Sequence, residues 1–261
     1  NEILVRINNR KPELHDLCRI NTRTGQGQVV FQNDAGYVGM LPDSEFNVRL
    51  ASKVLASGGS IAYMRDSAEA DWYELASWGL EDSQTSGPLG FDREGKIAYV
   101  MDSRGSNTGC LHAYDMTPAD GPQYVMLACN PKADLGNVVF SPITGKPQAA
   151  AFEYGRVLWT VLDPAIQPDW DYLSTVNAGE MNIASRDHAD RKWIVSYMID
   201  DGPVKFYLYN RDKRNATYLF SNRSQLENLP LVKMQPVVIP ARDGLEMVSY
   251  LTLPSNGKEN L

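Results

Sequence analysis

The sequence predicts an all-β protein, a β-propeller built of four-stranded blades. Short runs rich in Val, Ile, Tyr and Leu are separated by clusters of Gly, Asp, Asn and Pro, with hardly any 3.6-residue periodicity. Three long groups of these runs share one order of strand, polar turn, strand, polar turn and strand. Two weaker copies fit between them.

The copies begin at Ile3, Ile61, Ile97, Gln148 and Trp193, and the four steps from Ile3 to Trp193 average 47.5 residues. They occupy residues 3–31, 61–78, 97–127, 148–163 and 193–220. A four-stranded propeller blade takes roughly 40 to 50 residues, so this spacing indicates about five recognisable blades. Because a closed seven-bladed ring is longer, we expect an incomplete propeller whose other blades precede residue 1 or have diverged.

The middle strands of the copies are apolar on both faces rather than alternating. Residues 97–101, IAYVM, and residues 206–209, FYLY, are the clearest examples. A strand between two neighbouring sheets buries both faces, whereas a sandwich strand with one wet face alternates. Stacked blades therefore explain these strands better than a two-sheet sandwich.

The pattern changes near residue 230. Pro230, Pro236 and Pro240 accompany a predicted strand at residues 237–239, which is followed by a turn at 241–244 and a strand at 245–253. Asp243-Gly244 supplies the positive φ that a tight hairpin needs. We therefore expect a propeller domain at residues 1–230, followed at 231–261 by a linker and the first strands leading into a catalytic domain that is absent from the chain.

The end of the chain carries a family resemblance. KFYLYN (205–210), TYLF (217–220), LPLVKMQPV (229–237) and PARDGLEMVSYLTLP (240–254) resemble the prolyl oligopeptidase family of serine peptidases. The acylaminoacyl-peptidase and dipeptidyl-aminopeptidase-like branch is the nearest match, and residues 90–111 also resemble a blade of that branch. In this family, an Arg-Asp-Gly-hydrophobic hairpin and a strand ending in Leu-Pro lead from the propeller into an α/β-hydrolase domain.

The resemblance implies a role in a serine peptidase, but the chain lacks the residues that would carry out catalysis. The family's nucleophile lies in G-x-S-x-G and is followed by Asp and His, but the nearest segment here, residues 57–60, lacks that spacing, and a His-Gly-Gly loop is missing. We expect a noncatalytic, substrate-gating propeller of a serine peptidase that hydrolyses short peptides, inactive alone. A free-standing propeller scaffold for protein interactions is the alternative, and a metal-dependent propeller hydrolase is a third reading.

Candidate chemical residues are few, and the sequence assigns no catalytic, cofactor-binding or metal-binding residue. His188 could act as a base beside Asp187 or Asp190, but a polar turn is the favoured interpretation. Asp200-Asp201 and the Asp169-Trp170-Asp171 segment lack calcium-loop spacing and are interpreted as solvated turns. The five tryptophans are expected to pack between blades.

Glu153 invites a separate comparison. Dipeptidyl peptidases of the resembling family hold the free amino terminus of a substrate with a paired Glu-Glu. Only one glutamate is present at this position, so no binding role is carried over to it.

Composition limits the partners. The net charge of −7 and the pI near 5.0, without a basic cluster, argue against nucleic acid, and the short apolar runs argue against a membrane span. Cys18, Cys110 and Cys129 are interpreted as buried free thiols, which favours the cytoplasm, although the sequons at Asn215 and Asn222 point the other way. The expected partners are a peptide substrate, the protein's own hydrolase domain and a second copy that pairs through open strand edges.

Overall fold

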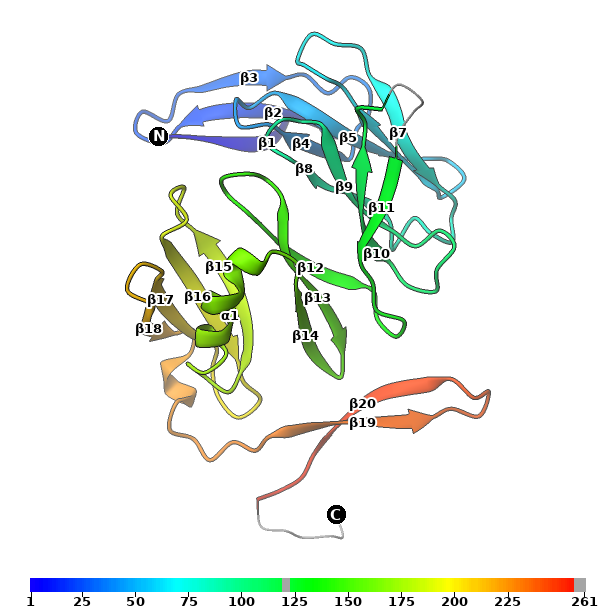
Figure 1. The fold of residues 1–261 in the computed structure, drawn as a ribbon. Coiled ribbons are helices and arrows are strands. Elements are labelled where there is room, and N and C mark those ends of the chain that lie inside the picture. Colours follow the sequence, from blue (N-terminus) through cyan, green and yellow to red (C-terminus); the bar gives the residue numbers. More distant parts are fainter. Residues whose placement is uncertain (119–122, 256–261) are drawn as a thin grey trace. The chain divides into compact units, whose positions relative to one another are not determined.

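The computed structural model describes residues 1–118 and 123–255. The chain divides into two compact units, Asn1–Asp134 and Leu135–Leu261. Each unit is built from antiparallel sheets whose strands follow one another in chain order (Figure 1).

The described part of the first unit contains three sheets. They are formed by β1–β3, β4–β7 and β8–β11. Their strands are β1 Glu2–Lys11, β2 Leu14–Asn21, β3 Gly27–Phe31, β4 Gly39–Pro42, β5 Val48–Val54, β6 Ser60–Met64, β7 Tyr73–Trp78, β8 Gly87–Phe91, β9 Ile97–Asp102, β10 Cys110–Asp115 and β11 Gln123–Ala128.

The second unit contains, among its described residues, two larger sheets and a hairpin. They are formed by β12–β14, β15–β18 and β19–β20. Their strands are β12 Leu135–Phe140, β13 Pro147–Tyr154, β14 Arg156–Val161, β15 Glu180–Arg186, β16 Lys192–Met198, β17 Lys205–Asn210, β18 Asn215–Ser221, β19 Met234–Pro240 and β20 Glu246–Thr252.

The predicted fold class is confirmed, because each of the five repeats falls in one blade-like sheet. β9 is buried on both faces, as the prediction requires of a strand between sheets. Four of the repeats begin earlier in the sequence than predicted, because β4, β8, β12 and β15 precede the residues at which these copies were recognised.

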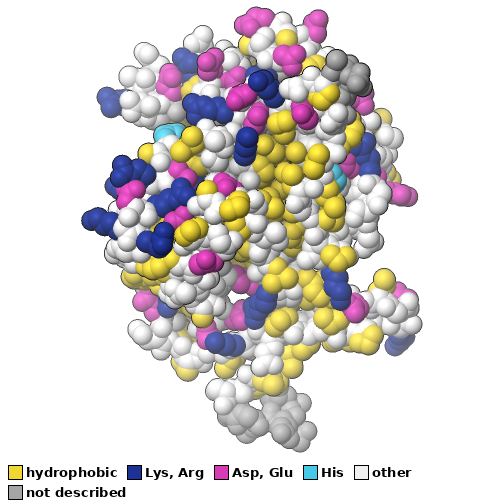
Figure 2. Space-filling model, in the orientation of Figure 1, with side chains coloured by type: hydrophobic (Ala, Val, Ile, Leu, Met, Phe, Trp, Pro, Cys, Tyr) yellow, Lys and Arg dark blue, Asp and Glu magenta, His cyan; other side chains and the backbone are white. Residues whose placement is uncertain are grey.

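The predicted hairpin is present with shifted bounds: its first strand, β19, is longer than predicted, and its second strand, β20, is shorter. β19 and β20 pair from Met234↔Thr252 to Pro240↔Glu246, and Gly244 in the turn has φ +89°. Several of its apolar side chains are exposed, including Leu245 at 68%. Figure 2 shows these hydrophobic side chains along the ribbon that β19 and β20 form.

One expected turn is a helix instead. Pro164–Ile166 form a 3₁₀ turn, η1, that runs into the helix α1, Gln167–Leu173, with a proline in the first turn of each. Asp169 is buried and accepts hydrogen bonds from Tyr209 Oη and Arg211 Nε, each at 2.7 Å. The interpretation of the Asp169-Trp170-Asp171 segment as a solvated turn was therefore wrong.

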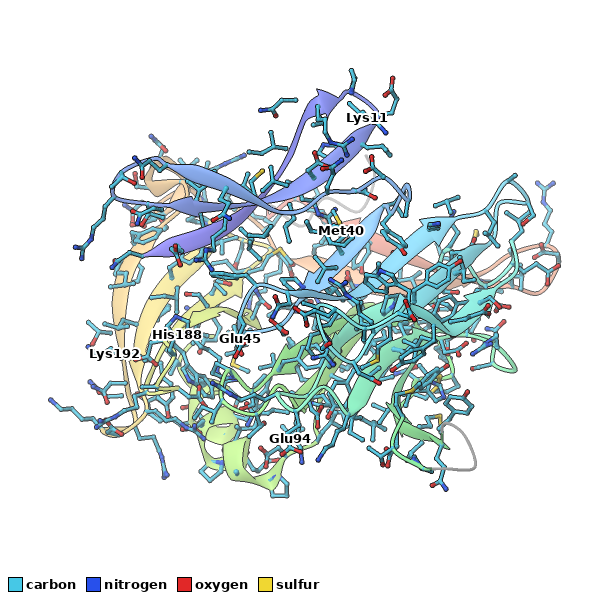
Figure 3. All side chains as sticks on the ribbon, turned by 90° about the horizontal axis from the view of Figure 1, so that it is seen from above. Lys11, Met40, Glu45, Glu94, His188 and Lys192 are labelled. Carbon is cyan, nitrogen blue, oxygen red and sulfur yellow. A yellow bond between two sulfur atoms is a disulfide. The ribbon has the colours of Figure 1, made fainter. Side chains whose placement is uncertain are left out.

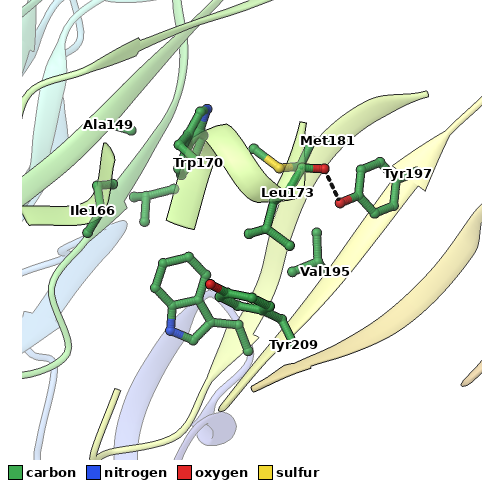
Figure 4. Packing of buried hydrophobic residues seen from close by; sticks show 10 residues of the cluster. Ala149, Ile166, Trp170, Leu173, Met181, Val195, Tyr197 and Tyr209 are labelled. Carbon is green, nitrogen blue, oxygen red and sulfur yellow. Dashed lines mark hydrogen bonds between the residues drawn. The ribbon is translucent and has the colours of Figure 1, made fainter. Parts of the chain in front are cut away.

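The helix completes a hydrophobic core against the last blade. Leu173 and Trp170 pack with Trp193, Val195 and Tyr197. Figure 4 shows this packing, in which Tyr197 Oη donates a hydrogen bond to the Leu173 carbonyl at 2.7 Å. A phenol that is buried with its hydroxyl satisfied stabilises the core without leaving an unpaired polar group.

The interpretation of all three cysteines as free thiols was also wrong. Cys110 at the start of β10 and Cys129 after β11 form a disulfide, with a Cα–Cα distance of 4.5 Å. β10 and β11 are adjacent strands, so their pairing brings the two residues together. Cys18 is a buried free thiol, as predicted.

The described residues contain no helix long and apolar enough to cross a membrane. On the face drawn in Figure 2, Lys and Arg side chains are interspersed with Asp and Glu side chains.

Candidate functional site

A cavity of about 370 Å³ lies between the β12–β14 sheet and the first two strands of the β15–β18 sheet. Its size falls within the range of sites for small ligands, about 300 to 1,000 Å³. It is lined by Gly136, Asn137, Ala151, Phe152, Glu153, Val157, Trp159, Glu180, Asn182, Ser196, Met198 and Val204.

Strand pairing explains why these residues share a cavity. In one sheet, Glu153 pairs with Val157 and Ala151 pairs with Trp159. Side chains at paired and alternate positions project to one face of a sheet, so this set forms one wall.

The other sheet supplies its wall by the same rule. Glu180 pairs with Met198, and Asn182 pairs with Ser196, across β15 and β16. Asn137 Nδ2 donates to Asn182 Oδ1 at 3.2 Å, and this bond joins the first strands of the two sheets.

The apolar part of the cavity is held rigidly by Trp159. Its Nε1 donates to the Met181 carbonyl at 2.9 Å, and its ring meets Trp170 edge to face with centroids 5.1 Å apart. The indole therefore bridges two sheets, as expected of a tryptophan between blades, and presents a fixed aromatic surface.

Two carboxylates lie in the same cavity. Glu153 is exposed at the end of a buried stretch of β13, and Glu180 begins β15 with a side chain 20% exposed. The Val157 amide donates to Glu180 Oε1 at 3.3 Å. The sequence pointed to Glu153 but missed Glu180, which lies 27 positions later and joins it only because adjacent sheets pack together.

Arg156, the first residue of β14, borders the cavity. Its Nη1 and Nη2 donate to the two carboxylate oxygens of Asp200 at 2.8 and 2.6 Å, and Nη1 lies 3.7 Å from Glu180 Oε1. The hydrogen bonds to Asp200 raise the pKa of Arg156 and lower the pKa of that carboxyl group. Asp200 is thus an ion-pair partner rather than a free turn carboxylate.

Among the described residues, no carboxylate is hydrogen-bonded to His188 that would make it a base. It is exposed in the turn between β15 and β16, before Lys192 (Figure 3). Asp187 accepts backbone bonds from Arg191 and Lys192, while Asp190 accepts bonds from Arg186, Arg211 and Trp193. The polar-turn interpretation is consistent with this arrangement.

The described residues contain no group of three or more His, Cys, Asp or Glu side chains arranged to hold a metal ion. The cavity is an apolar slot with carboxylates and amides at its edge. Such a slot suits an apolar group that carries a positive charge at one end.

Comparisons with known proteins find that the chain is similar to part of several peptidases. No family model matches it. The dipeptidyl aminopeptidase BIII of Pseudoxanthomonas mexicana is 36% identical over 258 residues, a match that spans 99% of this chain and 37% of that protein. A dipeptidyl peptidase family member 6 from Caenorhabditis elegans is 28% identical over 97% of this chain and 35% of its own length.

Solved structures agree in fold. Prolyl oligopeptidase B from Galerina marginata matches with a TM-score of 0.58 at 11% identity, over 95% of this chain and 36% of that chain. Porphyromonas gingivalis dipeptidyl peptidase 4 matches with a TM-score of 0.57 at 10% identity, over 99% of this chain and 39% of that chain.

The chain matches the N-terminal propeller portion of dipeptidyl and prolyl peptidases. This propeller portion spans little more than a third of the length of the curated relatives it matches. The resemblance seen at residues 90–111 and within 205–254 is confirmed and extends along almost the whole chain. Both curated relatives are named as peptidases, and neither is named as a free-standing scaffold.

Proposed function

We propose that this propeller portion gates the entry of substrate in a serine peptidase that hydrolyses short peptides. The observation that carries the proposal is the 36% identity, over 99% of the chain, to a dipeptidyl aminopeptidase. The physical role is steric, since a ring of blades admits a narrow chain and excludes a folded domain. The chain itself carries no G-x-S-x-G segment, so its chemistry belongs to another part of the protein.

The proposed division of the chain places the propeller domain at residues 1–230 and a linker with the first strands of a catalytic domain at 231–261. Exposed apolar side chains on the hairpin support a neighbouring domain that covers them: Leu245 is 68% exposed, Met247 48% and Leu253 53%. The proposed partners are this catalytic domain and a peptide substrate.

The cavity between β12–β14 and β15–β16 is the proposed site for the amino-terminal residue of the peptide. The ammonium group would bond to Glu153 and Glu180, while the side chain would lie against Trp159 and Met198. Charge-assisted hydrogen bonds to carboxylates are roughly twice as strong as neutral ones, so both glutamates favour a free amino terminus over a blocked one.

Calorimetric titration with a short peptide tests this site. We expect Glu153→Gln and Glu180→Gln each to weaken binding by about tenfold, close to 1.4 kcal/mol. Glu74→Gln, an exposed glutamate on β7, is the matched control and should bind as the unaltered chain does. Equal affinity for the free and the acetylated peptide would contradict the proposal.

The compartment of the protein is a separate proposal, because the sequence and the structure favour different answers. The sequence favours the cytoplasm, where thiols stay reduced, whereas the Cys110–Cys129 disulfide favours an oxidising compartment. Alkylation in fresh lysate decides between them. Three reactive cysteines in the unfolded chain before reduction would support the cytoplasm, and one would contradict it.

Self-association through strand edges is also proposed. Tyr124, Val125 and Met126 on β11, at one edge of its sheet, are 56%, 58% and 60% exposed. Light scattering should show assemblies that Val125→Lys disperses, and a monomer at every concentration would oppose the proposal.

A further inference from the structure

Three consecutive residues lie at the hairpin of β19 and β20: Tyr154 at the end of β13, Gly155 in the turn and Arg156 at the start of β14. Tyr154 Oη donates to Glu246 Oε2 at 2.7 Å, and Arg156 Nη2 donates to the Met234 carbonyl. Between them, Gly155 has φ +71°, and a Cβ added there would lie 3.1 Å from Pro236 Cβ. A side chain at Gly155 would thus be strained by its backbone and crowded by the hairpin.

The same turn meets the cavity on its other side. Arg156 Nη1 lies 3.7 Å from Glu180 Oε1, and the next residue, Val157, donates its amide to that same oxygen at 3.3 Å. Val157 and Glu180 both line the cavity. Glu180 Oε1 therefore contacts both the guanidinium of Arg156 and the backbone amide of Val157.

Asp200 fixes the orientation of this guanidinium. Its two oxygens accept from Nη1 and Nη2, and the side chains of Arg156 and Asp200 are 35% and 17% exposed. A planar guanidinium held at two points directs its remaining N–H groups, which lysine cannot imitate. Arg156 accordingly reaches Glu180 and Met234 at once.

We propose that Arg156 is a positioning residue that turns Glu180 toward β14 and clamps the hairpin, so that the cavity and the hairpin are energetically coupled. In this arrangement Glu180 Oε1 is engaged by Arg156 and Val157, and its second oxygen is the one proposed to bind the ligand. The ligand part of this proposal rests on the proposed function, whereas the coupling of Glu180 to the hairpin stands on the contacts alone.

Hydrogen exchange of the hairpin amides tests the coupling without any ligand. Arg156→Gln should speed exchange at β19 and β20 about tenfold, and Glu180→Gln about twofold, because local opening becomes easier when charged contacts are lost. The double variant should exchange no faster than Arg156→Gln, since Glu180 acts through the arginine. Arg191→Gln, which removes an exposed ion pair with Asp212 at another turn, is the matched control.

Two small probes test the positioning of Glu180. Phenylalaninamide carries an ammonium group, and 3-phenylpropanamide is the same molecule without it. We expect Arg156→Gln to weaken phenylalaninamide about fivefold and leave 3-phenylpropanamide unchanged, with partial rescue in Arg156→Lys. A merely structural role would weaken both probes alike and would contradict the positioning role.

The outcomes separate the two proposals. If phenylalaninamide does not bind the unaltered chain, the proposed peptide site fails and the ligand part of the inference fails with it. If hairpin exchange is the same in Arg156→Gln and the unaltered chain, the coupling is overturned whatever the probes do. Additive effects of Arg156→Gln and Glu180→Gln on exchange would overturn it as well.

Discussion

At the scale of single residues, buried ion pairs determine how the sheets are held. Asp190 accepts from both Arg186 and Trp193, and its side chain is 4% exposed. Arg211 joins it from the next turn with Nη1 at 2.7 Å. Because three donors converge on one carboxylate, removing it leaves buried charge without a partner.

We therefore predict that Asp190→Ala lowers the free energy of unfolding by about 3 kcal/mol, since it leaves the buried Arg186 unpaired. Asp212→Ala removes an exposed carboxylate that pairs with Arg191 and should cost under about 1 kcal/mol. Urea unfolding followed by tryptophan fluorescence measures both. Equal losses in the two variants would contradict the role given to Asp190.

Asp102 makes the stability of the folded protein depend on pH in the acidic range. Burial alone would raise the pKa of Asp102, but hydrogen bonds from Arg104 and Tyr114 outweigh it and lower the pKa to about 2. A carboxyl group whose pKa falls on folding stabilises the protein above its unfolded pKa, about 3.9. That contribution is lost as the pH drops from about 4 to about 2.

The corresponding prediction is that the urea midpoint falls between pH 5 and pH 2, and that Asp102→Asn flattens part of this fall. The amide of Asp102→Asn does not titrate and carries no charge at pH 5, so this variant is already less stable than the unaltered chain at pH 5. An equally steep fall in Asp102→Asn would show that other carboxyl groups control acid unfolding.

Two acidic residues show why part of the candidate site and of the core could not be predicted from the sequence. Glu153 could be singled out through the family resemblance, but its cavity needs Glu180, which only sheet packing brings near. The sequence indicated a solvated turn at Asp169 because the segment lacks calcium-loop spacing, yet Tyr209 and Arg211 satisfy its carboxylate in the interior. Partners distant in sequence decide both cases.

At the scale of elements, the repeats were predictable where strands are long and apolar. β9 and β17 stood out, while β4, Gly39–Pro42, and β8, Gly87–Phe91, are short and carry Gly and Pro. Such strands form because a neighbour pairs with them, which no local pattern reveals. The seven-residue α1 was missed because it spans only about two helical turns.

The hairpin of β19 and β20 was predictable from its turn chemistry, and the turn offers a test. Gly244 has φ +89°, so Gly244→Ala should destabilise the hairpin by about 1 kcal/mol and speed its amide exchange about fivefold. Asn tolerates positive φ better than Ala does, so Gly244→Asn should recover part of the protection. Unchanged exchange in Gly244→Ala would mean that the turn does not control the hairpin.

At the scale of the whole molecule, the proposed function is to gate the entry of substrate in a serine peptidase. The chain itself carries no nucleophile segment. The family, the blade pattern and the lack of a nucleophile segment were visible in the sequence. The cavity and its link to the hairpin were not, because they arise from two sheets and a turn that meet only in the fold. In the proposed function, residues 1–230 stand before a catalytic domain in the same protein.

The most direct measurement is hydrolysis by the protein that contains this chain together with its catalytic part. The substrate is one peptide, offered free, acetylated at its amino terminus, or placed in a loop of a folded domain. We predict that the free peptide is cleaved, that acetylation slows cleavage about tenfold through loss of the bonds to Glu153 and Glu180, and that the folded form resists. Comparable cleavage of the free and folded forms would contradict the account.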